Sequence, residues 1–214
     1  MDIEKEFDQD YDFFVKLREK HRQMIFTDYE KDNERLLEIA QKYKNVLTED
    51  GKYFWLMGSC WVLLQKAQYR LSAIDCFEKY LKLLPFEAEI KVTPIYIYRH
   101  FGTKQPETPE EFAFAKKIHF QNVYYDLAKL YEKENDTVNA FKCIQNGINL
   151  LPNYQFVFYY VLYDVCRKSN DLPLFLTYCE RLTAQERKEI DNMICRAKEL
   201  IARNYVFKPR RSKK

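Results

Sequence analysis

Apolar residues recur at intervals of three and four along most of the chain, and this spacing predicts amphipathic α-helices. The pattern is clearest over residues 121–152, where two apolar stripes flank a polar turn at 134–137. The stripe positions are Tyr124, Leu127, Ala128 and Tyr131 before the turn, and Ala140, Ile144, Gly147 and Leu151 after it. The small residues among them allow two helices to approach closely. We therefore expect residues 121–152 to fold as a tight helical hairpin.

Helices are expected along the rest of the chain because the same spacing recurs between turn signals. The other predicted helices cover residues 3–24, 27–46, 52–67, 71–84, 155–168, 173–182 and 184–202. Capping boxes, in which Thr is followed three residues later by Glu, begin three helices, at Thr27, Thr108 and Thr183. The helix that begins after Thr108 would run to Glu134, which is about 25 residues or about 37 Å.

The regular spacing of apolar residues is interrupted in the segment 86–108, which contains Pro94, Gly102 and Pro106. Residues 87–100 are expected to form either a short helix or irregular structure. Alternatively they run extended, because Ile and Tyr alternate in the sequence VTPIYIY. The insertion is thus either a degenerate repeat or a loop that carries contacts.

The hairpin over residues 121–152 resembles a tetratricopeptide repeat, whose pattern is W-x2-L-G-x2-Y, then A-x3-F, then Pro. Seven positions carry the resemblance: Tyr124, Leu127, Ala128, Tyr131, Ala140, Ile144 and Pro152. A second copy covers residues 54–85. Its Ala73 lies 140 − 73 = 67 positions before Ala140, and its Pro85 lies 152 − 85 = 67 positions before Pro152. Two repeats of about 34 residues give nearly that spacing. A looser copy covers residues 155–182.

The resemblance implies an all-α fold in which antiparallel helical hairpins stack as a short right-handed solenoid of about 8–10 helices. We expect one domain over residues 1–205 and a basic disordered tail over 206–214. The predicted parts are a diverged hairpin (3–46), a repeat (52–85), an irregular insertion (86–108), the clear repeat (109–152), a loose repeat (155–182) and a capping helix (184–202).

Composition agrees with a folded, reduced protein. Hydrophobic residues make up 47% of the chain and aromatic residues 16%, which is typical of a globular domain. The acidic N-terminus has no apolar signal segment, and no stretch reaches the length of a membrane span. Six cysteines form no CxxC pair, so we interpret them as reduced thiols of a cytoplasmic protein. We expect no metal, no cofactor and no enzymatic activity, since no catalytic or phosphate-binding motif is present.

The resemblance also implies a binding groove lined by the first helix of each hairpin. The corresponding positions are Asn122, Tyr125, Lys129 and Glu132 in the clear repeat, Trp55, Gly58, Val62 and Gln65 in the upstream copy, and Phe156, Tyr159 and Tyr163 in the loose copy. Aromatic residues supply much of the binding energy in peptide grooves. The alternative is that these aromatic residues belong to the core. Burial is the better interpretation for the helix that contains Tyr159, and both interpretations stay open for Trp55 and Tyr125.

The distribution of charge along the chain indicates a second candidate binding segment, at the C-terminal end. The net charge is +3, but residues 1–50 carry 14 acidic and 9 basic side chains, whereas residues 195–214 carry 1 acidic and 8 basic ones. The basic tail consists of Lys208, Arg210, Arg211, Lys213 and Lys214. Such a run contacts phosphate, directs nuclear import or merely keeps the end of the chain soluble.

Three functions follow from these patterns. The first is an adaptor that binds a protein or peptide partner in the groove. The second is a nucleic-acid-associated protein that uses the basic tail, and the third is a self-assembling structural subunit. The sequence does not fix the oligomeric state.

Overall fold

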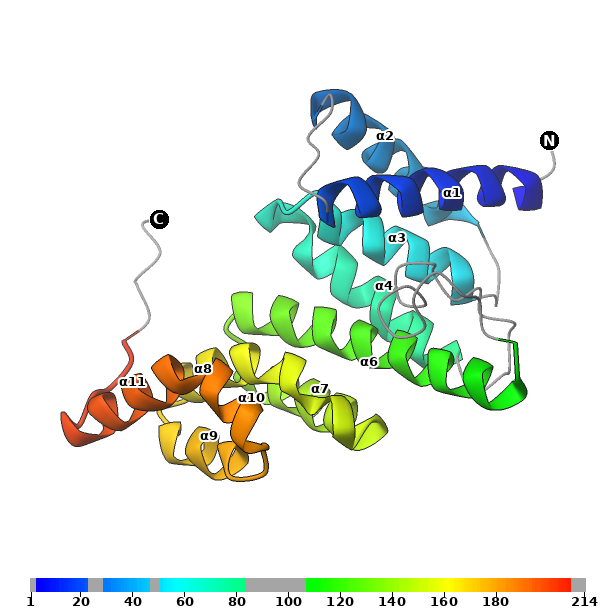
Figure 1. Cartoon of the computed structure of the whole chain (residues 1–214). Helices are drawn as coiled ribbons and strands as arrows, with labels where there is room; N and C mark the ends of the chain where they lie inside the picture. Colours follow the sequence, from blue (N-terminus) through cyan, green and yellow to red (C-terminus); the bar gives the residue numbers. More distant parts are fainter. Residues whose placement is uncertain (1–2, 23–28, 47–50, 84–106, 209–214) are drawn as a thin grey trace. The chain divides into compact units, whose positions relative to one another are not determined.

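A computed structural model describes residues 3–22, 29–46, 51–83 and 107–208, and this part of the chain is all-α (Figure 1). It divides into two compact units, an N-terminal unit over Met1–His119 and a C-terminal unit over Phe120–Lys214. The boundary falls inside one helix, α6 (Pro109–Lys133), which supplies residues to both units. The domain expected over residues 1–205 is therefore described below as two units.

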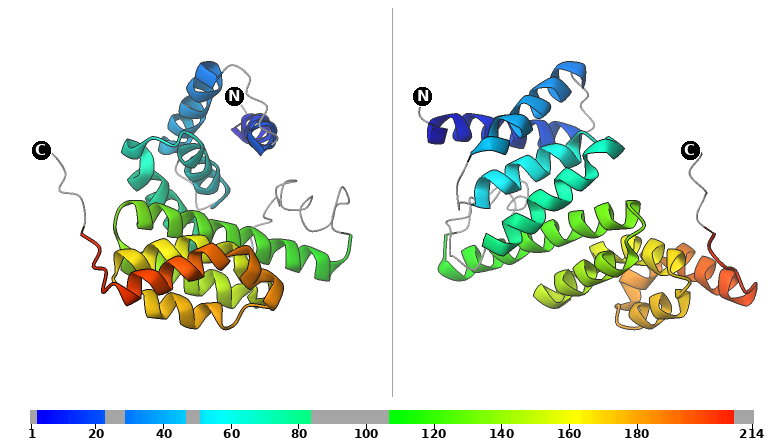
Figure 2. Two further views of the ribbon diagram at one scale, coloured as in Figure 1. Left: turned by 60° about the vertical axis from the view of Figure 1, so that its left-hand side comes forward. Right: turned by 180° about the vertical axis from the view of Figure 1, so that it is seen from behind.

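The N-terminal unit is built around α3 (Gly51–Leu63), most of whose residues are buried. This helix pairs with α4 (Arg70–Leu83) after a 3-10 turn, η2 (Ala67–Tyr69), and both views in Figure 2 show the two helices side by side. The remaining elements are α1 (Ile3–Arg22), α2 (Tyr29–Lys42), η1 (Tyr43–Asn45) and the beginning of α6. The aromatic rings of Phe7, Tyr43 and Tyr53 pack against one another in the core.

The buried carboxylate of Asp10 joins α1 to α2 in this unit. Its oxygens lie 2.5 Å from the Arg35 guanidinium and 2.7 Å from Lys42 Nζ, and they accept a hydrogen bond from Tyr43 Oη at 2.8 Å. A buried charge is tolerated when it is paired and hydrogen-bonded in this way. The Asp10 cluster therefore fixes α1 on α2 by specific contacts as well as by apolar packing.

The C-terminal unit consists of the rest of α6 and a run of short helices. These are α7 (Thr137–Leu150), η3 (Pro152–Phe158), α8 (Tyr159–Lys168), α9 (Leu172–Cys179), α10 (Ala184–Glu189) and α11 (Asp191–Ala202). Consecutive helices pack on one another: α7 contacts η3 and α8, and α9 contacts α8 and α11. A Cβ atom on Gly147 would lie only 2.1 Å from the Phe158 ring, so the lack of a side chain permits this approach.

The same turn ends α6, α8 and α11. Asn135, Asn170 and Asn204 adopt left-handed backbone conformations, with φ of 62°, 60° and 49°. The N–H of the following residue donates to the carbonyl five positions earlier in each case, as in a Schellman motif. The three asparagines are separated by 170 − 135 = 35 and 204 − 170 = 34 residues. Gln65, the left-handed residue after α3, precedes Asn135 by 70 residues, which is twice 35.

At the first two turns the residue after the asparagine is an aspartate that caps the next helix. Asp136 accepts a hydrogen bond from Asn139 N at 3.0 Å, and Asp171 accepts one from Leu174 N at 3.3 Å. Each Asn-Asp pair thus closes one helix and begins the next. This periodic turn is a structural repeat within the C-terminal unit.

Several expected elements agree closely with the structure. The expected helix over 109–134 is α6, and the capping boxes at Thr108 and Thr183 are both formed. The packing positions of the clear hairpin, Leu127, Ala128, Ala140 and Ile144, are almost fully buried. The expected capping box at Thr27 and residues 86–106 of the expected insertion lie outside the described residues.

Several expected helices differ in detail from those observed. The helix expected over 52–67 ends at Leu63, and Ala67 begins a 3-10 turn. Residues 152–158 form a 3-10 segment, so the helix expected from 155 begins at Tyr159. The single helix expected over 184–202 is divided into α10 and α11 at Ile190, whose φ is −110° and whose side chain is 1% exposed. The break thus falls at a buried residue.

Candidate functional site

The groove residues expected in the N-terminal unit do not form an exposed surface. Trp55 is 5% exposed, and its indole packs against Phe14 and His119 at centroid distances of 5.6 and 5.3 Å. Gly58 is buried against Phe77. Gln65 lies after the end of α3, where its left-handed conformation closes the helix. The structure therefore places Trp55 in the core, which is the alternative left open for it, and Gln65 in an exposed turn after α3.

The groove residues expected on α6 lie on its outer side in the C-terminal unit. Tyr125 is half-buried, and its ring meets the Phe158 ring edge-on at 5.8 Å. Lys129 is exposed and holds its Nζ 5.3 Å above the Tyr125 ring, which is a cation–π distance. Asn122 is half-buried one turn earlier. Tyr125 and Lys129 thus present an aromatic ring and a positive charge together.

Glu132 serves mainly as a structural link. Its side chain is 15% exposed and lies 2.7 Å from Lys168 Nζ, which also donates to the Glu132 carbonyl at 2.6 Å. A mostly buried pair of this kind fixes the end of α6 to the end of α8. Because the Glu132 carboxylate is paired and mostly buried, it is poorly accessible to an external ligand.

Of the two site residues expected on α8, Tyr159 belongs to the core and Tyr163 is half-buried. Tyr159 is fully buried, and its hydroxyl donates to the Tyr178 carbonyl on α9 at 2.8 Å. Burial raises the pKa of Tyr159 well above its ordinary value. Tyr160 is 50% exposed instead, so it replaces Tyr159 in the candidate site. The signal that identifies Tyr160 is its spacing of four from Asp164 and seven from Arg167, which are two of the three charged residues of this helix.

The outer side of α8 forms what we call the α8 face, which consists of Tyr160, Tyr163, Asp164 and Arg167. These residues are spaced at i, i+3, i+4 and i+7 and so lie on one side of the helix. Arg167 donates to Asp164 at 3.0 Å, and partial burial raises the pKa of Tyr163, which keeps its hydroxyl protonated. Phe156, in η3, extends the face by meeting Tyr160 edge-on at 6.0 Å.

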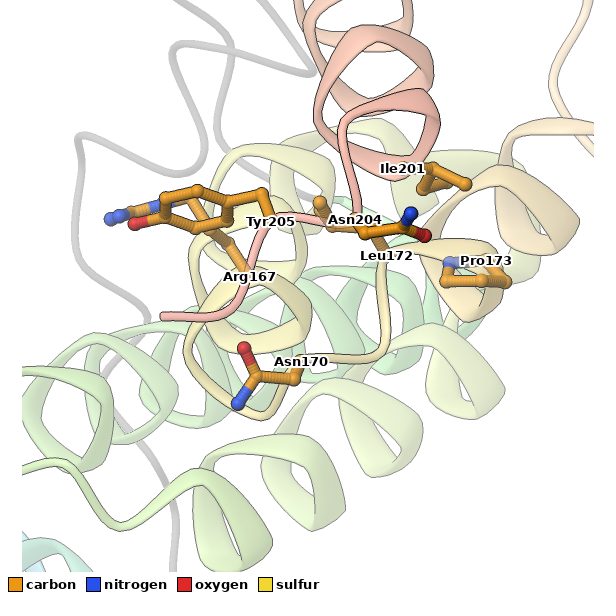
Figure 3. A pocket seen from close by; sticks show the side chains of 7 residues that line it. All are labelled: Arg167, Asn170, Leu172, Pro173, Ile201, Asn204 and Tyr205. Carbon is orange, nitrogen blue, oxygen red and sulfur yellow. The ribbon is translucent and has the colours of Figure 1, made fainter. Parts of the chain in front are cut away.

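A pocket of about 180 Å³ lies at one end of this face (Figure 3). It is formed by the turn between α8 and α9 and by the end of α11. The lining residues are Arg167, Asn170, Leu172, Pro173, Ile201, Asn204 and Tyr205. Leu172, Pro173 and Ile201 supply apolar surface, whereas the arginine and the two asparagines supply hydrogen-bonding groups. Such a pocket suits a ligand with an apolar side chain and a polar backbone.

The segment after α11 borders the pocket. Asn204 turns the chain, and residues 205–208 continue without regular structure. Phe207 N donates to Asn170 Oδ1 at 2.5 Å, and the Arg167 guanidinium lies 5.4 Å from the Phe207 ring centroid. The expected disordered tail therefore includes Phe207, which has specific contacts. Lys208 is exposed, and the other basic-tail residues, Arg210, Arg211, Lys213 and Lys214, lie outside the described part of the chain.

The side chains offer binding chemistry more readily than nucleophilic chemistry. Burial raises the pKa of Cys166 to about 12 and that of Cys179 to about 11, and nucleophilic attack requires the thiolate. Among the described residues, no group of His, Cys, Asp and Glu side chains is arranged to hold a metal ion. Within the same residues no helix is long and apolar enough to cross a membrane.

Comparisons of the chain with protein-family models, with curated proteins and with solved structures found no match.

Proposed function

We propose that this chain is a non-enzymatic adaptor with a tetratricopeptide-like repeat fold, and that the α8 face binds a protein or peptide partner. The observation that carries the proposal is the α8 face itself. Half of the residues of α8 are buried, whereas Tyr160 is 50% exposed beside the half-buried Tyr163, Asp164 and Arg167. Tyr and Arg are the residues enriched at the energetic centres of protein interfaces. An exposed aromatic surface on an otherwise apolar helix is explained by a partner that covers it.

The repeat architecture supports the proposal. Left-handed residues recur at spacings of 35 and 34 in the C-terminal unit, Ala128 and Ala140 are fully buried, and Gly147 lies close to the Phe158 ring. In an array of such hairpins, the first helices of successive repeats line one surface. Here these helices are α6 and α8. Tyr125 and Lys129 on α6 extend the binding surface, because the Tyr125 ring contacts Phe158 immediately before α8.

A capture experiment with matched variants tests this proposal. The intact chain is used to recover partners from a native lysate, with and without nuclease. The site variants are Tyr160→Ala and Lys129→Glu, and the control is Val138→Ser, which changes a 65% exposed residue on α7 of the same unit. We expect the control to recover a protein partner and Tyr160→Ala to lose at least about tenfold in affinity, which is about 1.4 kcal/mol.

Circular dichroism shows whether each variant folds. Equal recovery by all folded variants would contradict the proposed site. The same experiment distinguishes the alternatives. Recovery that disappears with nuclease or on removal of residues 206–214 would favour nucleic acid, and light scattering that shows an oligomer at tens of micromolar would favour self-assembly.

A further inference from the structure

The segment Tyr205–Lys208, which we call the C-terminal strap, lies against one end of the α8 face. The Phe207 N–H donates to Asn170 Oδ1 at 2.5 Å, and the Phe207 ring lies 5.4 Å from the Arg167 guanidinium. Tyr205 borders the pocket together with Arg167 (Figure 3). The strap therefore contacts an arginine of the α8 face through an aromatic ring, and the adjoining turn through its backbone.

The surface under the strap is fixed by contacts that do not involve the strap. Asp164 accepts a hydrogen bond from Arg167 on the same helix at 3.0 Å. Asn170 is held in its left-handed conformation by the turn, where Asp171 N donates to the Cys166 carbonyl at 2.8 Å. Arg167 and Asn170 are thus already oriented by α8 and its turn. A surface that is organised in advance loses less entropy when a ligand binds.

The strap itself has few contacts. It has no regular secondary structure, and Tyr205 and Val206 are 42% and 59% exposed. Phe207 is half-buried, and Tyr205 faces the helices where it borders the pocket. Segments with few buried apolar contacts open at low cost in free energy. Tyr205 N anchors the start of the strap by donating to the Leu200 carbonyl at 2.9 Å. Beyond Tyr205, the attachment of the strap depends on the Phe207 ring and on the hydrogen bond from Phe207 N to Asn170.

The repeated turns show that the strap departs from the local pattern. After Asn135 and Asn170 the chain continues with an aspartate that begins α7 or α9. After Asn204 it continues with Tyr205 and forms no helix up to Lys208. The strap thus lies where the other two turns lead into a helix, and its extended backbone leaves the Phe207 N–H available to Asn170.

We infer that the strap is an intramolecular ligand of the α8 face, and that it competes there with an extended partner segment carrying an aromatic residue. The inference rests on the proposed function, since the partner is the one that the α8 face binds. The partner segment would be recognised by the same two contacts that the strap makes with Arg167 and Asn170. Arg167 takes an aromatic ring, and Asn170 takes the N–H of the same residue, which any non-proline residue supplies.

Substitution within the full chain tests the intramolecular contact. Phe207→Ala removes the ring, and Val206→Ala is the matched control because the Val206 side chain is exposed one position earlier. The measurement is the NMR position of the Asn170 side-chain amide and the Arg167 Nε–H. We expect both signals to move in Phe207→Ala and to stay in place in Val206→Ala. Unchanged signals in Phe207→Ala would overturn the inference.

A peptide added in trans tests the recognition chemistry. The probe is an acetylated and amidated peptide with the sequence of residues 203–208, and its control carries Ala at the position of Phe207. A tethered segment acts at an effective concentration in the millimolar range, so the free peptide is used at about 1–5 mM. We expect the probe to return the Asn170 and Arg167 signals of Phe207→Ala toward their original positions. A probe without effect, or a control peptide with equal effect, would overturn the inference.

Competition is measured on the recovered partner. We expect Phe207→Ala to bind the partner at least fivefold more tightly than the unmodified chain does, and Val206→Ala to bind it equally. If Phe207→Ala and the unmodified chain bound the partner equally, the inference that the strap competes with the partner would be overturned. The peptide experiment needs no partner, so a failure of the proposed function and a failure of the strap contact give different results.

Discussion

Gly147 is a position where the backbone of α7 lies close to the Phe158 ring. A methyl group there would lie 2.1 Å from Cζ of Phe158, which is itself fully buried. We expect Gly147→Ala to destabilise the protein by about 1–3 kcal/mol, because the ring must move within a packed core. Chemical denaturation monitored by circular dichroism measures this change.

The neighbouring Asn146→Ala is the control, since Asn146 is exposed on the same helix. It removes no packing and raises helix propensity slightly. A Gly147→Ala variant as stable as Asn146→Ala would show that Phe158 does not need the space.

Asp10 is the residue on which the polar contacts between α1 and α2 depend. Replacing it with Ala leaves the buried Tyr43 hydroxyl without its acceptor and removes a carboxylate from beside Arg35 and Lys42. We expect a loss of on the order of 3 kcal/mol in the free energy of unfolding, which is typical of breaking a buried charged pair. Asp12→Asn, an exposed change on the same helix, should alter stability by less than about 0.5 kcal/mol. Equal effects of the two substitutions would contradict this role of Asp10.

The repeated turns make a prediction at the scale of the element. Asn135 has a φ of 62°, a conformation that costs an ordinary L-residue about 1–2 kcal/mol and glycine almost nothing. We therefore expect Asn135→Ala to destabilise the hairpin of α6 and α7 by about 1 kcal/mol and Asn135→Gly to be nearly neutral. Thermal unfolding of the two variants side by side checks this. A glycine variant as unstable as the alanine variant would show that the Asn135 side chain, and not its backbone, is required.

Local signals explain how much of the fold could be predicted from the sequence. Thr108 and Thr183 begin α6 and α10 because each side chain accepts a hydrogen bond from the backbone three residues on. That interaction is local, so the sequence reveals it. The break at Ile190 and the 3-10 segment before Phe158 depend on burial against other elements, and the apolar spacing along one helix does not specify such contacts.

The candidate site was less predictable because exposure depends on distant residues. Trp55 is buried by Phe14 on α1, and Tyr159 is buried because its hydroxyl reaches the Tyr178 carbonyl on α9. Neither partner is near in sequence. By contrast, Lys129 over Tyr125 is an i, i+4 pair on one helix, so its spacing is visible in the sequence. Their place in a binding groove stays a prediction. The strap contact from Phe207 to Asn170 spans 37 residues, and no sequence pattern indicates it.

At the scale of the whole molecule, the buried histidine of α6 determines one part of the response to pH. His119 is 1% exposed, and its Nε2 lies 2.8 Å from the Tyr80 hydroxyl. Its ring also packs on Trp55 at 5.3 Å. Burial, together with the smaller effect of the nearby positive charge of Arg18, lowers the pKa of His119 to about 3. The folded protein therefore keeps this imidazole neutral at pH values where an exposed histidine is charged.

The consequence for stability follows from the protons that each state binds. The unfolded chain protonates this histidine near pH 6.5, whereas the folded chain does so only near pH 3. The contribution of His119 is thus fully present above pH 6.5 and is lost as the pH falls toward 3. We expect this loss to lower the free energy of unfolding by up to about 1.4 kcal/mol for each unit by which the pH falls between 6.5 and 3.

His119→Gln isolates this contribution because glutamine does not titrate and can still hydrogen-bond to Tyr80. The measurement is the free energy of unfolding in urea at several pH values between 4 and 6.5, for the unmodified chain and the variant. We expect the variant to be less stable at pH 7 and to have a shallower slope below pH 6.5, since only the other titrating groups remain. Tyr80→Phe retains the imidazole and should therefore retain the steeper slope. Equal slopes in the unmodified chain and in His119→Gln would show that His119 takes up its proton in the folded state, and that burial does not keep it neutral.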